Sequence, residues 1–546
     1  MQINRRLAAL YLLISILLAV APHAGSTSNS RVHITILGTT DLHGNIYPID
    51  YYTNTPDNRG LAKIATLIGL VRKENPNVLL IDSGDTIQGT PLAYYHNRKN
   101  NTPPNPMMVV MNSLGFDAMT VGNHEYNFGL QVLEKARSEA KFPWLSANTY
   151  ETAAQKNRYQ PYLIKEIAGV RIAVLGLTTP GIPNWENIPN YAGLDFREPL
   201  VEAKKWVPLL REKERADVVV VAMHMGLEED LRTGVINPQV RNENQAVAIA
   251  KEVPGVDVVF MGHTHRDVPA VTINGVLLTQ ANHWGRHLAR ADLYLEETDG
   301  KWRIYALAAR TLPSDDRVEP DPAVLKLAEP YDRETQAWLS RPIGESAAEV
   351  TAREARFRDT AILDLIQRVQ LEVGKADVSM AASFNPQARI EKGPVTVRDI
   401  AGLYVYENTL AVLEVTGEQL KDALEHSARY FRVYEPGKVP ADLVDEKIPA
   451  YNFDVAEGVT YDLNISKPHG QRIQNLRFKG TPVRPDQKFR LATNNYRVNG
   501  GGGYTMYKNA PVLYRSGEEI RELIIDWVER HKRIPVEPTN NWRIVL

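Results

Sequence analysis

Six apolar, β-branched runs recur along the first half of the chain, and each ends in a cluster of polar residues. In one-letter code they are VHITILGTTD, NVLLIDSGD, DAMTVGNHE, RIAVLGLTT, DVVVVAMHMG and VDVVFMGHTH. Continuous apolar runs of this length are typical of strands that are buried on both faces of a sheet. Segments with helical periodicity lie between several of them, including GLAKIATLIGLVRKE and LQVLEKARSEA. The alternation predicts a layered α/β domain whose sheet contains strands of mixed direction.

The pattern changes after the first domain. Residues 312–344 are charged and interrupted by proline, although the middle of the segment can form a helix. Residues 345–546 return to an α/β alternation, with FRDTAILDLIQRVQLEV and GEQLKDALEHSARYF as helices and DVSMAAS and KFRLATNNY as strands. We therefore expect two α/β domains, at residues 31–311 and 345–546, joined by a linker helix at residues 312–344. No internal repeat is present at the spacing of a solenoid.

The N-terminus has the order of a secretory signal peptide. The segment MQINRR carries two arginines, the run LAALYLLISILLAV is uncharged, and small residues follow it. A membrane anchor is the alternative, but the apolar run is shorter than the roughly 20 residues that span a bilayer. We therefore expect residues 1–25 to be a cleaved signal peptide. The mature protein would have no stable membrane span, and it would be exported to a periplasm or released from the cell.

Composition narrows the choice of ligand. The chain has 546 residues and a net charge of −2, with 63 basic and 65 acidic residues. A binder of duplex nucleic acid usually has a basic excess, so we expect any anionic ligand to be held by a local site. The chain has no cysteine, which excludes disulfides and thiolate metal ligands and is compatible with an oxidising compartment.

The polar clusters after the strands contain metal-binding side chains. Because ligands bind at the carboxyl ends of strands in α/β sheets, these clusters should lie together. Taken singly, an aspartate is often a turn residue and a histidine is often a capping or packed residue. One tetrahedral ion needs four ligands, so the seven candidates predict two ions that share a carboxylate. The candidates are Asp41, His43, Asp85, Asn123, His224, His263 and His265.

The order D-x-H, G-D, G-N-H-E, H and G-H-x-H resembles that of the calcineurin-like metallophosphoesterases. Longer segments resemble the exported two-domain 5′-nucleotidase family: TDLHGN, GDTIQGTPLA, GNHEYNFGL and GHTHRD in the first domain, and GPVTVRDIAGLYVYENTL, YNFDVAEGVTYDLNISKP and LATNNYR in the second. The nearest branch is that of the bacterial periplasmic 2′,3′-cyclic-nucleotide 2′-phosphodiesterase/3′-nucleotidases. The resemblance covers nearly the whole mature chain. It implies a four-layer metallophosphoesterase domain followed by an α/β 5′-nucleotidase C-terminal domain that binds the substrate.

The resemblance also implies two divalent metal ions of the manganese, zinc or iron type. One ion would be held by Asp41, His43, Asp85 and His265, and the other by Asp85, Asn123, His224 and His263, with Asp85 bridging them. A hydroxide bound to both ions would attack the phosphorus atom of the substrate. His124 would not be a ligand, but would stabilise charge on the phosphate or protonate the leaving oxygen.

Asn127 bears on the type of substrate. The 5′-nucleotidases of the family have an aspartate at this position, which pairs with the catalytic histidine, whereas the cyclic phosphodiesterase branch has asparagine. We expect Asn127 to orient His124 and to leave it less basic than a His–Asp pair would. The alternative is that Asn127 only caps the following helix. His265 also favours the cyclic branch, because several 5′-nucleotidases have glutamine at that ligand position.

The second domain should recognise the nucleoside. Tyr406 and Tyr496 match the two aromatic residues that clamp the base in the family, although either tyrosine alone would be a half-buried packing residue. Arg356, Asn385 and Arg389 match polar positions for phosphate or ribose, although exposed arginines are common. The 5′-nucleotidases have an aspartate in a GGDG turn that contacts the ribose, and here Gly502 takes its place. The glycine-rich turn itself is more similar to that of the 5′-nucleotidases.

These features predict an exported dinuclear-metal nucleotide phosphohydrolase. It would hydrolyse 2′,3′-cyclic nucleotides to 3′-nucleotides, and 3′-nucleotides to nucleosides and phosphate. One alternative is a 5′-nucleotidase or UDP-sugar hydrolase with the same metal centre. An alternative from another class is a non-catalytic exported binding protein. The small-molecule nucleotide is the only partner that the sequence indicates, and the oligomeric state stays open.

Overall fold

The structure, a computed structural model, describes residues 30–236, 243–406 and 408–546. The expected signal peptide at residues 1–25 lies outside the described residues. Two six-stranded sheets form the centre of the N-terminal half. The first sheet has the order β17 (Lys301–Pro313), β16 (His287–Thr298), β1 (Arg31–Thr39), β4 (Val78–Asp82), β5 (Ala118–Thr120) and β6 (Trp144–Leu145). The second has the order β14 (Asp267–Ile273), β15 (Val276–Ala281), β13 (Val258–Met261), β12 (Val218–His224), β10 (Val170–Thr178) and β9 (Tyr162–Ile167).

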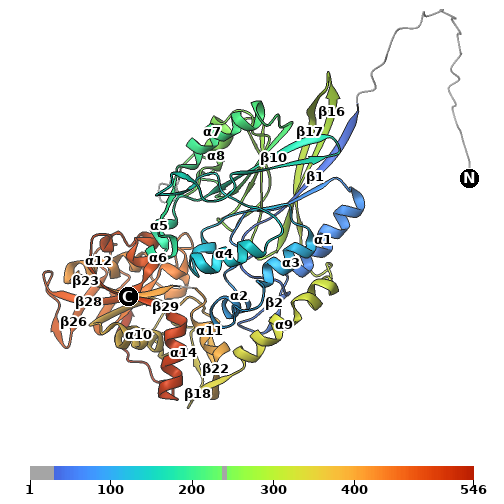
Figure 1. The fold of residues 1–546 in the computed structure, drawn as a ribbon. Coiled ribbons are helices and arrows are strands. Elements are labelled where there is room, and N and C mark those ends of the chain that lie inside the picture. Colours follow the sequence, from blue (N-terminus) through green and yellow to red (C-terminus); the bar gives the residue numbers. More distant parts are fainter. Residues whose placement is uncertain (1–29, 237–242, 407) are drawn as a thin grey trace, which may run out of the picture.

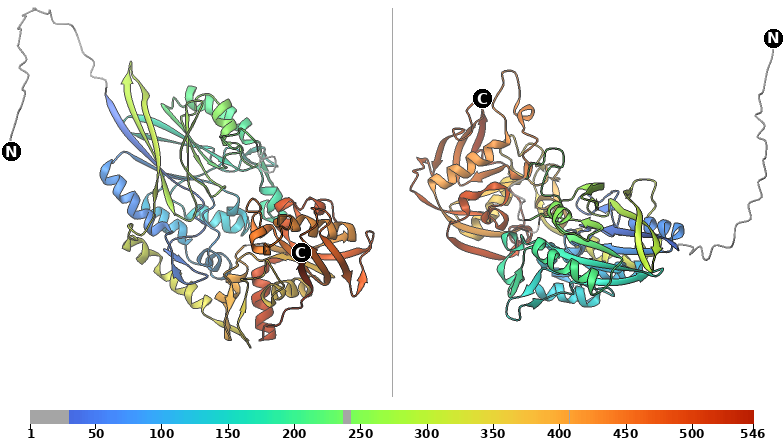
Figure 2. Two further views of the ribbon diagram at one scale, coloured as in Figure 1. Left: turned by 180° about the vertical axis from the view of Figure 1, so that it is seen from behind. Right: turned by 90° about the horizontal axis from the view of Figure 1, so that it is seen from above.

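The two sheets pack face to face and are covered by helices on their outer faces (Figures 1 and 2). Ile36 and Ile81 of the first sheet share one buried cluster with Val220 and Phe260 of the second. Helices α1 (Leu61–Glu74), α3 (Pro106–Leu114) and α4 (Leu130–Glu139) cover the first sheet. Helices α7 (Pro199–Glu212) and α8 (Ala246–Glu252) cover the second. The four-layer α/β architecture predicted from the sequence is therefore confirmed.

All six predicted strands of the first half are confirmed, as β1, β4, β5, β10, β12 and β13. The predicted mixed direction is also confirmed, because β1 is parallel to β4 and antiparallel to β16. Strands β14 to β17 were not predicted. Strand β17 alternates exposed and half-buried residues, so its sequence lacks the continuous apolar run of a buried strand.

A long helix follows the first pair of sheets. Helix α9 (Pro322–Leu339) begins at Asp321, whose side chain accepts hydrogen bonds from the backbone N–H groups of Ala323 and Val324. It contacts α1, α3 and α2 (Pro91–Tyr94) on one side and α11 (Val397–Leu403) on the other. Figure 1 shows it running along the outer helices of the N-terminal half. Soon after α9, β18 (Pro342–Ser346) pairs with β22 (Gly393–Thr396) of the C-terminal half.

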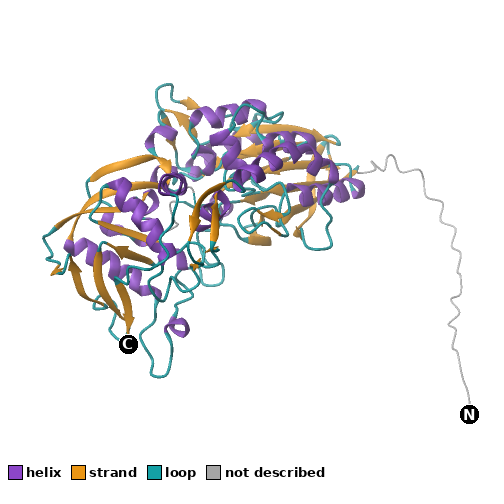
Figure 3. Ribbon diagram, turned by 90° about the horizontal axis from the view of Figure 1, so that it is seen from below, coloured by secondary structure: helices purple, strands orange, loops and turns teal. Residues whose placement is uncertain are grey.

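The C-terminal half is a second α/β unit (Figure 3). Its five-stranded sheet has the order β24 (Asp454–Glu457), β20 (Val378–Ala382), β28 (Lys488–Asn494), β23 (Thr409–Thr416) and β29 (Val512–Glu519). Its four-stranded sheet has the order β27 (Thr481–Pro482), β26 (Ile473–Phe478), β25 (Val459–Asn464) and β30 (Trp542–Val545). The longer helices besides α11 are α10 (Ala361–Gly374), α12 (Gly417–Ser427) and α14 (Ile520–His531). The helices and strands predicted for this half are confirmed.

Shorter elements shape the junction and the surface. Small strand groups are β2 (Ile49–Asp50) with β3 (Thr55–Pro56); β7 (Thr149–Glu151) with β8 (Lys156–Asn157) and β11 (Leu194–Phe196); and β19 (Val350–Thr351) with β21 (Arg389–Ile390). Helices α5 (Ile182–Trp185) and α6 (Ile188–Tyr191) lie beside the C-terminal half in Figure 1, where α5 contacts α13 (Asn495–Val498).

The two halves share a core. One continuous cluster of buried apolar residues runs from Leu37 in β1 through Val324 and Leu339 of α9 to Trp542 in β30. Ion pairs add to the contact: Arg98 lies 2.8 Å from Glu519, and Lys99 lies 2.5 Å from Glu522. Among the described residues, no helix combines the length and the apolar character that crossing a membrane requires.

Candidate metal centre

The predicted ligands follow the carboxyl ends of neighbouring strands. Asp41 comes two residues after β1, Asp85 three residues after β4, and Asn123 three residues after β5. His224 is the last residue of β12, and His263 follows β13. The two sheets bring these ends to one edge of the sandwich, so side chains distant in sequence lie within contact of one another.

The first group of ligand atoms comes from Asp41, His43 and His265. The Nε2 atoms of His43 and His265 are 3.1 Å apart. Asp41 Oδ1 lies 3.4 Å from His265 Nε2 and 4.0 Å from His43 Nε2. One carboxylate oxygen and two imidazole nitrogens therefore converge on a single point, which is the donor set that zinc or manganese accepts.

The second group comes from Asp85, His224 and His263. His224 Nε2 lies 2.9 Å from Asp85 Oδ2 and 3.1 Å from Asn123 Oδ1. The ring of His263 packs edge-on to that of His224, with 5.2 Å between the ring centroids. Two separate groups of candidate ligand atoms are therefore present among the described residues. Their assignment to two ions stays a prediction. A role for Asp85 as the bridging ligand stays a prediction.

The second nitrogen of two ligand histidines has a hydrogen-bond acceptor. His224 Nδ1 lies 2.8 Å from the backbone oxygen of Ser83, and His43 Nδ1 lies 3.1 Å from Gln88 Oε1. Each Nδ1–H therefore donates away from the cluster, and each Nε2 presents its lone pair to it. In its neutral form each Nε2 is a donor atom that divalent ions accept, so the residues fit such ions.

Burial and the neighbouring charges shift the pKa values of these groups. Burial and the charge of His265 together lower the pKa of His43 to about 3. Burial works to raise the pKa of Asp41, but the hydrogen bond and charge of His265 outweigh it and hold the pKa at about 2. The pKa of Asp85 is likewise well below its usual range, because His224 and His124 outweigh the effect of burial. Metal ions bind neutral imidazole and ionised carboxylate. The two aspartates and His43 are in these forms, whereas, against the effect of burial, the charges of Asp85 and Asp41 raise the pKa of His224 to about 10 and also raise that of His265. A metal ion would therefore displace protons from these two histidines.

Five of the seven predicted ligands have a left-handed backbone conformation. Their φ values are 50° at Asp41, 48° at His43, 60° at Asp85, 70° at His263 and 54° at His265. Such residues cost about 1–3 kcal/mol each and persist where the surrounding structure enforces them. A concentration of strained residues in one spot is typical of a functional site.

Glu125 holds the ligand loops in place. This buried carboxylate accepts hydrogen bonds from the backbone N–H groups of Asp85 at 2.9 Å, Thr86 at 2.6 Å and Gly122 at 2.8 Å. It therefore ties the turn that carries Asp85 to the turn that carries Asn123. Glu125 belongs to the GNHE motif, but the motif alone does not indicate this role.

His124 lies at the edge of the metal centre. Its Nε2 is 4.0 Å from Asp85 Oδ2, and its Nδ1 is 2.6 Å from Asn127 Oδ1. Asn127 therefore contacts His124 as expected. The alternative that Asn127 caps the next helix is wrong, because the cap of α4 is Gly129 and no side chain caps it.

The predicted base-binding tyrosines belong to the C-terminal half. Burial and the nearby Tyr451 raise the pKa of Tyr496, with a smaller contribution from Glu243, whose Oε2 lies 3.7 Å from His263 Nε2. Tyr406 is 43% exposed, and its ring packs edge-on to Phe384. The ring of Tyr451 lies 6.4 Å from that of Tyr406. Tyr451 was not singled out from the sequence, although it lies in the YNFD segment of the resemblance.

The three other predicted substrate residues have different surroundings. Arg356 is half-buried, and its Nε has no partner among the described residues. Both ends of the Asn385 amide are used in a turn, because Nδ2 donates to Gly402 O and Oδ1 accepts from Gln387 N. Arg389 is exposed and forms ion pairs with Glu349 and Glu391. Of the three, Arg356 keeps the most hydrogen-bonding capacity for a ligand.

The side chains of Asn452 and Arg497 occupy the space beside Gly502. Gly502 has a φ of 69°, and a Cβ at this position would collide with Asn452 Oδ1 and Arg497 Nη1. The Arg497 guanidinium is fixed by a buried ion pair with Asp454 at 2.8 Å. An aspartate therefore fits at position 502 only if this cluster moves.

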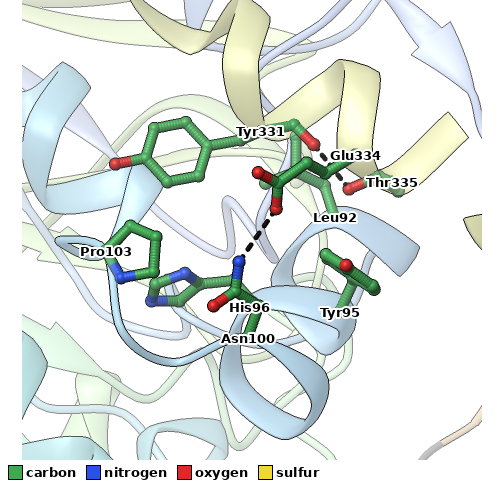
Figure 4. A pocket seen from close by; sticks show the side chains of 8 residues that line it. All are labelled: Leu92, Tyr95, His96, Asn100, Pro103, Tyr331, Glu334 and Thr335. Carbon is green, nitrogen blue, oxygen red and sulfur yellow. Dashed lines mark hydrogen bonds between the residues drawn. The ribbon is translucent and has the colours of Figure 1, made fainter. Parts of the chain in front are cut away.

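A separate small pocket lies between the π-helical turn at Tyr95–Lys99 and α9 (Figure 4). Asn100 donates a 2.9 Å hydrogen bond to Glu334 across it, and the ring of His96 packs edge-on to Tyr331. None of the predicted ligands lines this pocket, so it is distinct from the metal centre.

Two families match the chain. The calcineurin-like phosphoesterase family matches residues 34–267, and the 5′-nucleotidase C-terminal domain family matches residues 342–509. One match lies in each α/β unit.

Named relatives and a solved structure agree with these matches. The chain is 32% identical to the 2′,3′-cyclic-nucleotide 2′-phosphodiesterase/3′-nucleotidase of Salmonella typhimurium, over 95% of this chain and 90% of that protein. It is 30% identical to the trifunctional nucleotide phosphoesterase protein YfkN of Bacillus subtilis, where 98% of this chain spans only 40% of the longer protein. The crystal structure of a candidate 5′-nucleotidase from Staphylococcus aureus superimposes with a TM-score of 0.82 at 29% identity, over 94% of this chain and all of that one.

Proposed function

The chain belongs to the family of phosphoesterases that join a calcineurin-like phosphoesterase domain to a 5′-nucleotidase C-terminal domain, and from this premise we propose that it hydrolyses 2′,3′-cyclic nucleotides and 3′-nucleotides. It is a metal-dependent phosphoric ester hydrolase. The observation that carries the proposal is the pair of adjacent ligand groups, with His124 beside them. The name of the Salmonella relative supports the choice of substrate.

We assign the seven ligands to two ions, with Asp41, His43 and His265 in one group and Asn123, His224 and His263 in the other, and Asp85 between them. Divalent ions in such a site lower the pKa of a water molecule and neutralise the phosphoryl oxygens. The protein fixes the donor atoms in advance, through the hydrogen bonds of His43 and His224 to Gln88 and Ser83.

His124 donates a proton to the leaving oxygen in this proposal. In the first reaction the oxygen of water bonds to phosphorus, the P–O2′ bond breaks and O2′ takes a proton. In the second reaction the P–O3′ bond breaks and O3′ takes the proton. His124 Nε2 points toward the metal centre while Nδ1 is held by Asn127, so Nε2 supplies this proton.

The C-terminal half holds the nucleoside. Tyr406 and Tyr496 supply flat faces for the base, and stacking of this kind contributes about 1–3 kcal/mol per base. Tyr451 joins them because its ring lies beside that of Tyr406. Arg356 is assigned to the phosphate or ribose side, whereas Asn385 and Arg389 have protein partners that weaken their assignment.

Export is part of the proposal. A signal peptide at residues 1–25 would place the enzyme in a periplasm or outside the cell, where RNA breakdown leaves cyclic and 3′-nucleotides. The support is the order of charged, apolar and small residues in the sequence.

The second candidate is a 5′-nucleotidase or UDP-sugar hydrolase with the same metal centre. The similarity to the Staphylococcus aureus structure favours it. Against it stands Gly502, which lacks the carboxylate of the 5′-nucleotidase turn and whose surroundings leave no space for one.

Initial rates decide between them. The purified protein with manganese is assayed in parallel on 2′,3′-cyclic AMP, 3′-AMP and 5′-AMP. Fast turnover of the first two with little of the third is the expected result. A preference for 5′-AMP would assign the second function instead, and no turnover of any substrate after adding manganese or zinc would favour a binding protein.

A further inference from the structure

A chain of hydrogen bonds leads away from His124 into the protein. His124 Nδ1 bonds to Asn127 Oδ1 at 2.6 Å, and Asn127 Nδ2 donates to Glu186 Oε2 at 2.6 Å. Glu186 lies between α5 and α6, in the segment NWENIPN, about 60 residues beyond the GNHE motif. No motif in the sequence pointed to this residue.

The surroundings of Glu186 require a carboxylate. The residue is 9% exposed. Its Oε1 accepts hydrogen bonds from the backbone N–H of Asn187 at 2.6 Å and from Asn190 Nδ2 at 2.9 Å, while Oε2 accepts from Asn127. All three partners are donors, so both oxygens of Glu186 act as acceptors. A glutamine has one oxygen and one NH2 group and cannot satisfy both sides.

This arrangement decides which way the Asn127 amide points. Burial raises the pKa of Glu186, and the hydrogen bonds from Asn187, Asn190 and Asn127 oppose this rise. In its ionised form the carboxylate has no proton to donate, so the NH2 group of Asn127 faces Glu186. The amide oxygen then faces His124, and it can only accept. The Nδ1 of His124 must therefore carry a proton, and Nε2 is the atom that exchanges a proton with the substrate.

The same segment contacts the nucleoside-binding half. Asn187 Nδ2 lies 3.4 Å from Thr409 Oγ1 of β23, and α5 contacts α13, which carries Tyr496. Figure 1 shows α5 and α6 between the two halves. Glu186 thus connects the His124 side of the metal centre to a segment that touches the C-terminal half.

We propose that Glu186 is a positioning residue for catalysis, which fixes the orientation of the Asn127 amide and thereby the ring and the proton-bearing nitrogen of His124. The inference rests on the proposed role of His124 in hydrolysis. In this His–Asn–Glu arrangement the carboxylate acts on the histidine through the Asn127 side chain, whereas in a His–Asp pair the carboxylate contacts the histidine directly.

The proposal is tested by exchanging the amide of Asn127 and the carboxylate of Glu186, first singly and then together. In Glu186→Gln, the new NH2 group can face Asn187 and Asn190, which then lose their acceptor, or it can face Asn127, whose amide must then turn over. In either case kcat should fall about 10–100-fold, while KM and metal content stay unchanged. In Asn127→Asp, two carboxylates meet in a buried site, and kcat should also fall.

The double variant Asn127→Asp/Glu186→Gln restores the pattern. The new carboxylate at position 127 accepts from His124 and from the new amide at position 186, whose oxygen accepts from Asn187 and Asn190. We expect kcat within about threefold of the wild type, although each single change lowers it. A residue that only holds the 182–191 segment in place would show no such recovery.

The control is Glu202→Gln. Glu202 is also buried, and its Oε2 accepts from three donors, Tyr150, Lys205 and Trp206, far from the metal centre. It should lower thermal stability and leave kcat unchanged. The proposal is overturned if the double variant is no more active than the single ones, or if Glu186→Gln keeps the kcat of the wild type while His124→Ala loses it. Failure of the proposed function itself is separate, because the wild type would then be inactive on all three nucleotides.

Discussion

At the scale of single residues, the metal centre depends on backbone conformations that side chains rarely adopt. Asp41, His43, Asp85, His263 and His265 all have positive φ, and the hydrogen bonds of Glu125 hold two of the turns that surround them. The backbone at these candidate ligands is therefore fixed by the surrounding structure. This arrangement makes the residues that support the turns as important as the ligands.

The first prediction at this scale concerns Glu125. Glu125→Gln replaces one acceptor oxygen with a donor that faces backbone N–H groups, so the turns of Asp85 and Gly122 should shift. We expect manganese affinity to fall about 10–100-fold, as measured by titration with metal analysis of the protein. The control is Glu228→Gln. Glu228 is also a buried glutamate, and it accepts hydrogen bonds from the backbone N–H groups of Val247 and Ala248 at the start of α8. Equal affinities for wild type and Glu125→Gln would contradict the role.

The second prediction concerns His124. His124→Ala removes the proton donor but none of the proposed ligands. We expect kcat to fall about 10²–10⁴-fold, with the bound metal measured by mass spectrometry unchanged. His33→Ala is the control, because His33 lies at the opposite end of β1. Loss of metal together with activity would show that His124 acts as a ligand.

The third prediction concerns the pH dependence of stability. Burial, together with the charge of Asp359, raises the pKa of Asp364 to about 7. The folded state therefore binds this proton more tightly than the unfolded state, so its stabilisation is complete below about pH 4 and is lost as the pH rises to about 7. Asp364→Asn carries no charge at any pH. Its melting temperature should fall less than that of the wild type between pH 4 and 7, and parallel curves would refute the assignment.

At the scale of elements, helix ends provide a direct test of local stability. Thr416 caps α12: its side chain accepts from Gln419 N at 3.2 Å, and Gln419 Oε1 accepts from Thr416 N at 2.9 Å. Thr416→Ala should lower the free energy of unfolding by about 0.5–2 kcal/mol in urea denaturation. Thr416→Ser keeps the hydroxyl and should stay near the wild type. A cost for serine as large as for alanine would exclude the cap as the cause.

The sequence predicted the elements whose signal is local. The buried strands β1, β4, β12 and β13 have continuous apolar runs, and the ligands follow them because strand ends need turns. Strands β14 and β17 were missed because they are edge strands with exposed residues along them and lack such runs. Strands β15 and β16 are buried in the interior of their sheets and were also missed. Glu186 was missed because its partners come from tertiary contacts, and a glutamate between two prolines carries no pattern of its own.

The same limit applies to the substrate residues. The resemblance placed Tyr406 and Tyr496 in the C-terminal half, but the neighbours Tyr451 and Arg497 emerge only from the packing of β24, β28 and the glycine-rich turn. The sequence could not show that Arg389 is paired with two glutamates or that both ends of the Asn385 amide are used. Hydrogen-bond partners of polar side chains depend on the assembled fold.

At the scale of the whole molecule, α9 connects the two halves. Its buried residue Leu339 belongs to the cluster that runs through both, and Gln336 on the same helix accepts a 2.6 Å hydrogen bond from Arg398 of α11. The segment that the sequence presented as a linker is therefore packed rather than extended across a gap.

The corresponding prediction is that α9 stabilises both halves at once. Leu339→Ala leaves a cavity in the shared cluster and should cost about 2–5 kcal/mol, with a single calorimetric transition moved to lower temperature. Leu327→Ala on the same helix is the control, because Leu327 is 39% exposed. Two separate transitions, only one of them shifted, would show that the halves unfold independently.

The shared cluster also affects the time course of synthesis. A chain made at about 5–20 residues per second completes the N-terminal half and α9 roughly 10–40 seconds before the last strand emerges. During that interval the apolar side chains of Leu339 and Ile343 await partners from the C-terminal half, which include Val528 and Trp527. The nascent first half is thus exposed to chaperones and proteases for a period that lengthens with every delay in translating the second.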